Sequence, residues 1–162
     1  MAIDTKKVEG RRELQFQSLD DVLADLDQLA SGEVKTLGNW SLGQICGHLA
    51  AGMSSALDGS SFNPPFIFRL IGPFMKKKFL TGKMPTGFKI PKAAEGQFLP
   101  SNDVETEAAV GELRSAIERL KAASDADLVR HPMFGEMTKH EAEQFHLRHA
   151  EMHLSFVVPA AS

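Results

Sequence analysis

Residues 138–158 read TKHEAEQFHLRHAEMHLSFVV, and this stretch decides the predicted fold. It opens with a capping box, in which the Thr138 hydroxyl caps the first amides and the Glu141 side chain reaches back to the Thr138 amide. No helix-breaking residue follows until Pro159. The stretch therefore predicts one long helix from Thr138 to about Val158.

Three histidines of this predicted helix face the same way. At about 100° per residue, His146, His149 and His153 fall within roughly 60° of one another. They share that side with apolar neighbours, whereas the opposite face carries Gln144, Arg148, Glu151 and Ser155. The imidazoles are therefore expected to face the core.

Three further stretches have helical periodicity, each after a capping residue. We expect them at about 19–31 after Ser18, 42–58 after Ser41 and 103–123 after Asn102. A chain of 162 residues that is 43% hydrophobic can bury one sizeable core. Together these features predict a single all-α domain over residues 1–162, built as a four-helix bundle, with a long connection that allows a parallel pair of helices.

The connection at 60–100 holds six of the eight prolines and is expected to be an irregular insert or lid. A short helix fits 65–80, although Gly72-Pro73 is expected to interrupt it. The basic run Lys76-Lys77-Lys78 beside several phenylalanines fits a membrane surface, a protein partner or an anionic ligand. The residues favour a plainer alternative, in which the phenylalanines cover one end of the bundle and the lysines are solvated. No convincing alternating strand pattern is present.

Composition excludes several classes of protein. A net charge of -3 gives no basis for strong phosphate binding, so a nucleic-acid partner is not expected. No run approaches the roughly 20 apolar residues of a membrane span. The single cysteine, Cys46, excludes an intrachain disulfide and an all-cysteine zinc site. No apolar segment follows Arg11-Arg12 as a signal peptide would require, so a cytoplasmic location is expected.

Clustered imidazoles in an apolar sector are explained most simply by a divalent metal, which takes a lone pair from each neutral ring. His149 and His153 have the i,i+4 spacing of a shared ligand pair. His48 lies on the inward stripe of the second helix and can supply a ligand from another element. Three ligands with one open position would indicate a catalytic site, and four would indicate a structural one.

Other candidate residues have plainer interpretations. His131 and His140 are expected to be turn-forming or exposed, Cys46 to be a small buried side chain, and Trp40 to pack as a hydrophobic staple before the second helix. Glu141 and Glu143 lie close enough to the histidines for one of them to orient a ligand or move a proton, but the plainer expectation is a pair of carboxylates favoured by the dipole at the helix start.

Four segments together resemble the DinB-like (DinB/YfiT) superfamily, and specifically a bacterial branch of unknown function. The segments are Ser18–Asp21, Leu37–Leu49, His131–Gly135 and His146–Phe156. Each motif is loose alone, but their order is fairly specific. The resemblance implies a four-helix bundle that holds zinc or nickel through one histidine of the second helix and an HxxxH pair of the last.

Carried over by position, these ligands are His48, His149 and His153. A different register would align His146 with the first histidine of the family motif and put Ala150 where its partner should be. The i,i+4 geometry favours the first register, and His146 then remains a residue that supports the ligands or a fourth ligand.

The resemblance also implies function. Relatives include transferases and isomerases that use a low-molecular-weight thiol, so the chain is expected to be a metal-dependent S-transferase or a hydrolase of small molecules, and homodimers are common in such bundles. The alternative is a non-catalytic small-molecule-binding or stress-related bundle whose histidines form a hydrogen-bonded core.

Overall fold

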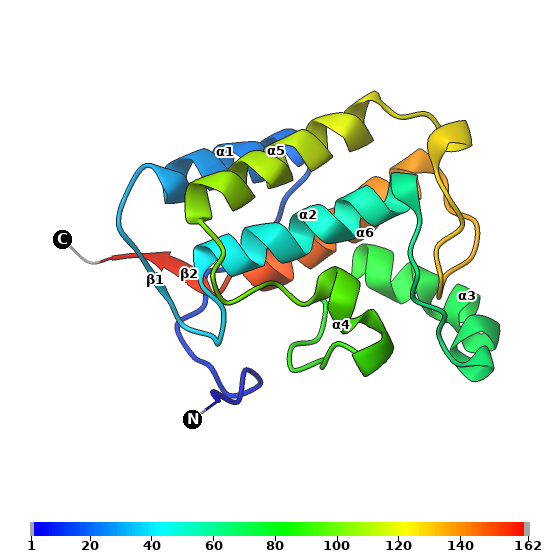
Figure 1. The fold of residues 1–162 in the computed structure, drawn as a ribbon, viewed down its shortest axis with the longest axis horizontal. Helices are drawn as coiled ribbons and strands as arrows, with labels where there is room; N and C mark the ends of the chain where they lie inside the picture. Colours follow the sequence, from blue (N-terminus) through cyan, green and yellow to red (C-terminus); the bar gives the residue numbers. More distant parts are fainter. Residues whose placement is uncertain (1, 161–162) are drawn as a thin grey trace.

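The computed structural model describes residues 2–160. This part of the chain is mostly helical, with six α-helices, one 3-10 helix and a small two-stranded sheet, and 55% of it is helix (Figure 1). In chain order the elements are α1 (Leu19–Ala30), β1 (Val34–Thr36), α2 (Leu42–Asp58), α3 (Phe66–Thr81), α4 (Lys92–Phe98), α5 (Thr106–Ala122), η1 (Asp125–Asp127), α6 (Lys139–Leu154) and β2 (Val157–Pro159).

Three of the expected helices begin where their capping residues predict. Ser18, Ser41 and Thr138 each accept a hydrogen bond from the amide three residues on, and the side chain at that position bonds back to the cap. Each box satisfies amides that would otherwise lack a partner at a helix start. Local side-chain chemistry is therefore enough to set these three starts.

Helices α1, α2, α5 and α6 pack on one another around the main core (Figure 1). The tightest pair is α2 and α5, where a Cβ at Gly43 would lie 3.1 Å from the Thr106 Cα. At the other end of the pair, Asp58 forms an ion pair with Arg119. The two helices are therefore parallel, as the long connection between them allows.

The mostly helical fold is confirmed. The expected four-helix bundle, however, does not account for all six α-helices of the described residues. Instead of an irregular insert, the 60–100 segment contains α3 and α4. Helix α3 continues through Gly72 and Pro73. Gly72 packs closely against the neighbouring loop, since a Cβ there would clash with the Met133 carbonyl oxygen. The bundle itself stays a prediction.

One end of each of the last two predicted helices needs correction. Helix α5 begins at Thr106 rather than 103, and the Asn102 side chain accepts from Gln44 at the start of α2 instead of capping α5. Helix α6 ends at Leu154, because Val157–Pro159 pairs antiparallel with Val34–Thr36. The strands were not predicted, since three residues are too short for an alternating pattern to show.

The polar face of α6 is covered by the segment before α1. Arg148 donates to the Phe16 carbonyl, while the Phe16 amide donates to the Glu151 carboxylate. Near the end of the helix, Arg11 donates to the Ser155 hydroxyl. Glu151 and Ser155 are consequently buried, although their residue types indicated a solvated face.

None of the helices within residues 2–160 is both long enough and apolar enough to cross a membrane.

Candidate metal centre

Three imidazoles meet between α2 and α6. His48 comes from α2, and His149 and His153 come from successive turns of α6. One ring nitrogen of each lies within 4.8 Å of the corresponding nitrogens of the other two. The ring centroids are 5.0, 4.7 and 4.8 Å apart, with steep interplanar angles of 77°, 64° and 73°. The rings therefore surround a common point rather than stacking in a column.

A backbone carbonyl orients His48 within this cluster. Its Nδ1 lies 2.7 Å from the carbonyl oxygen of Phe98, the last residue of α4. A carbonyl only accepts, so Nδ1 carries the proton and Nε2 presents its lone pair to the other rings. Histidines that bind metals typically donate their second ring N–H in this way.

Burial keeps the three rings neutral. It lowers the pKa of His48, against a smaller opposing effect from the Phe98 hydrogen bond. Burial, followed by the neighbouring imidazoles, holds the pKa of His149 well below its usual range. For His153, burial is again the largest cause of a pKa well below the usual range, with His48 and Arg11 adding to it. Neutral imidazole is the form that coordinates a metal.

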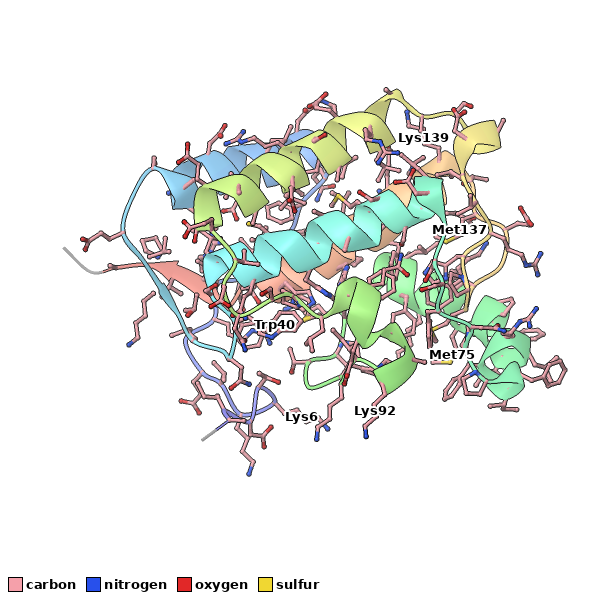
Figure 2. All side chains as sticks on the ribbon, viewed as in Figure 1. Lys6, Trp40, Met75, Lys92, Met137 and Lys139 are labelled. Atoms are coloured by element: carbon pink, nitrogen blue, oxygen red, sulfur yellow. The ribbon has the colours of Figure 1, made fainter. Side chains whose placement is uncertain are left out.

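Aromatic side chains enclose the cluster on two sides. The Trp40 ring stacks on His153 at 5.4 Å and 12°, and it also contacts His48 (4.9 Å). The Phe145 ring stacks on His149 at 5.9 Å. Figure 2 shows Trp40 beside the first turns of α2. The staple interpretation missed this role, because position before a cap does not reveal that the ring reaches α6.

One pair of these nitrogens has the spacing of ligands around a divalent ion, and the His153 nitrogen lies within 4.8 Å of both. Ligands 2.0–2.1 Å from a tetrahedral ion are about 3.3 Å apart, and His48 Nε2 lies 3.2 Å from His149 Nε2. The group within the described residues contains three neutral ligands and no carboxylate. His48 is buried, whereas His149 and His153 are half-buried.

His146 lies outside this group of three. Its ring is buried against Phe145, and its Nδ1 has no hydrogen-bond partner. Burial, followed by His131, lowers its pKa to about 3. The imidazoles of His146 and His131 both pack against Phe145, from α6 and from the loop before it respectively. The alternative of His146 as a fourth ligand therefore has no support from this geometry.

The weaker candidates behave as their plainer interpretations predict. Cys46 is fully buried, and burial raises the pKa of its thiol to about 12. His140 is exposed. His131 forms a turn, because its Nδ1 accepts from the amides of Met133 and Phe134. Glu141 closes the capping box of α6 and pairs with Lys76.

The model of one protein family matches residues 8–160, which is nearly the whole chain, and its description reads "Protein of unknown function (DUF1569)". The chain belongs to the DUF1569 family. No curated protein and no solved structure matches it. The expected membership of the DinB-like superfamily is thus wrong for this DUF1569 protein. That expectation depended on four segments whose motifs are each loose, including helix caps and an HxxxH pair, and short motifs of this kind also occur in unrelated proteins.

Proposed function

We propose that this DUF1569 protein binds one divalent metal ion, zinc or nickel, through His48, His149 and His153, and that it hydrolyses a small molecule there. The observation that carries the proposal is the meeting of three neutral imidazoles whose ligand nitrogens lie within 4.8 Å of one another. Imidazole nitrogen suits both metals. Three protein ligands leave a further position open, as catalytic sites do.

When bound, such an ion supplies Lewis acidity that lowers the pKa of a coordinating water. The chain's own residues prepare this chemistry. The Phe98 carbonyl holds His48 in the tautomer with a free Nε2. Trp40 and Phe145 limit the access of bulk water to His153 and His149.

A thiol-dependent transfer stays a prediction. A thiol would use the same open position, and its pKa would fall for the same reason. The expectation came from the family resemblance, however, and no residue of the cluster distinguishes a thiol from water. Adding small thiols to cobalt-substituted protein separates the two, because thiolate coordination produces a strong near-ultraviolet charge-transfer band.

The competing function is a non-catalytic binding protein with a hydrogen-bonded histidine core. The 3.2 Å contact is equally compatible with this alternative, because His149 Nε2–H donating to His48 Nε2 would also explain it. In that arrangement the protein needs no metal to keep the rings together. Metal content therefore discriminates between the two functions.

The test is metal analysis by plasma mass spectrometry on untagged protein. We expect about one equivalent in wild type and its loss in His48→Ala and His149→Ala, with far-UV circular dichroism showing a retained fold. His140→Ala is the matched control, because this exposed histidine lies on the same helix as His149. No metal after reconstitution, or equal metal in all variants, would contradict the proposal. Metal-dependent cleavage in an ester and amide panel, absent from His149→Ala, would then establish hydrolysis.

A further inference from the structure

Helix α3 exposes large apolar side chains along most of its length. Phe74 is 87% exposed and Phe66 75%, and neighbouring side chains on the helix are also open, namely Ile67, Phe68, Leu70, Ile71 and Met75. The expectation that the phenylalanines cover the end of the bundle is therefore wrong for Phe66, Phe68 and Phe74. An exposed cluster of this kind marks an interaction surface.

One narrow stripe fastens α3 to the body of the protein. Gly72 lies against the Met133 carbonyl, Lys76 pairs with Glu141, and Phe79 packs on Phe134. Positions 72, 76 and 79 share one side of a helix. The opposite side, which carries Ile67, Leu70 and Phe74, points away from the body. Figure 1 shows α3 at the end of the molecule remote from β1 and β2.

The segment that carries α3 is strongly basic. Residues 59–94 contain Arg69 and six lysines and no acidic residue, so their formal charge is +7. The remaining residues contain 11 basic and 21 acidic side chains and carry -10. The segment is therefore positively charged and the rest of the chain negatively charged, although the net charge of the whole protein is only -3.

We propose that α3 docks the protein on an anionic lipid surface, lying in the plane of the interface. The exposed side of the helix is apolar over its first three turns, and the exposed Lys77 and Lys78 follow in the next turn. Interfacial helices combine these two features, since apolar side chains enter the acyl boundary while lysines reach the headgroups. Each basic residue near the surface adds attraction to anionic lipid.

A second copy of the chain fits this surface less well. A two-fold contact would bring the same patch of both copies together, and each patch belongs to a segment of charge +7. Like charges at such short range oppose association. A lipid surface supplies both an apolar layer and negative headgroups, so it matches both properties of α3.

The test is co-sedimentation of the full chain with vesicles of phosphatidylcholine alone or mixed with phosphatidylserine. We expect binding to the mixed vesicles that weakens as salt is added. Charge reversal in Lys77→Glu with Lys78→Glu should weaken the apparent affinity about tenfold or more. The matched control is Lys7→Glu with Lys35→Glu, which changes charge equally at exposed positions outside the segment and should bind nearly as wild type does.

Phe74→Ser tests the apolar half of the proposal. This ring is 87% exposed, so its loss should leave the fold intact while weakening vesicle binding about tenfold. Ile3→Ser, at an exposed position outside α3, is the control. The proposal is overturned if wild type fails to sediment with the mixed vesicles, or if neither α3 variant lowers binding. It is also overturned if sedimentation velocity shows a dimer that Phe74→Ser converts to monomer, since a second copy then covers α3.

Discussion

The half-buried imidazole of His131 makes the stability of the protein depend on pH. Its Nδ1 accepts hydrogen bonds from two backbone amides, and its ring stacks on Phe134 with the ring centroids 4.6 Å apart. Burial lowers its pKa from 6.5 to about 4. As the pH falls below 6.5 the unfolded chain takes up a proton that the folded chain refuses, so the unfolded state binds more protons across this window. The free energy of unfolding therefore decreases on acidification between about pH 6.5 and 4.

Replacing His131 by Asn should reduce this pH dependence. The Asn side chain keeps an oxygen that accepts the turn amides but does not titrate. We expect the wild-type free energy of unfolding to have a steeper slope between pH 6.5 and 4, by up to about 1.4 kcal/mol per pH unit. Urea unfolding at several pH values measures both slopes. Equal slopes would show that His131 does not resist protonation, whatever the stability of the variant at pH 7.

Trp40 is expected to tune metal affinity without touching the ion. Its ring stacks on His153 and contacts His48, so it restricts both imidazoles. Trp40→Ala should weaken zinc binding about 10–100-fold, as loss of ligand-orienting contacts typically does. Trp40→Phe retains a stacking ring and should stay much closer to wild type. Competition with a chromophoric chelator measures these affinities, and equal affinity in Trp40→Ala would show that the stacking does not orient the ligands.

At the scale of elements, α3 depends on a close backbone approach at Gly72. A Cβ there would clash with the Met133 carbonyl oxygen, which is backbone and cannot rotate aside as a side chain does. Gly72→Ala should therefore separate α3 from the loop and cost about 1–3 kcal/mol of stability. Gly111→Ala in α5 is the control, because a Cβ at Gly111 meets nothing within 4 Å. It should instead stabilise by about 0.5–1 kcal/mol.

Urea unfolding gives both stability changes, and hydrogen exchange locates them. In Gly72→Ala we expect the amides of Phe66–Thr81 to lose protection first. Unchanged exchange in α3 would mean that the loop yields instead and that the helix keeps its position.

Helices and strands could be predicted from the sequence where neighbouring residues determine their ends. They could not be predicted where contacts with distant residues determine them. The capping boxes at Ser18, Ser41 and Thr138 give correct helix starts because each box satisfies its own backbone. The strand at Val157–Pro159 depends on a partner more than 100 residues away. Helix periodicity likewise predicted that His48, His149 and His153 face one core. It could not reveal that the Phe98 carbonyl orients His48, because that contact comes from a distant part of the chain.

At the scale of the whole molecule, the histidine cluster connects three elements. His48 belongs to α2, His149 and His153 belong to α6, and the Phe98 carbonyl at the end of α4 fixes the His48 ring. An ion that binds only when these elements are assembled stabilises the folded state by mass action. Metal binding should therefore protect α4 as well as the helices that supply the ligands.

Zinc should accordingly raise the melting temperature of wild type, and a chelator should reverse the effect. Free zinc at about 1,000 times its dissociation constant contributes about 4 kcal/mol. Because burial already keeps the three rings neutral, zinc displaces few protons from them, and the gain should change little between pH 6 and 7.5. Scanning calorimetry of wild type and His48→Ala measures the gain. An equal rise in His48→Ala would place the ion elsewhere, and a gain that fell steeply below pH 7 would show that the rings are protonated before zinc binds.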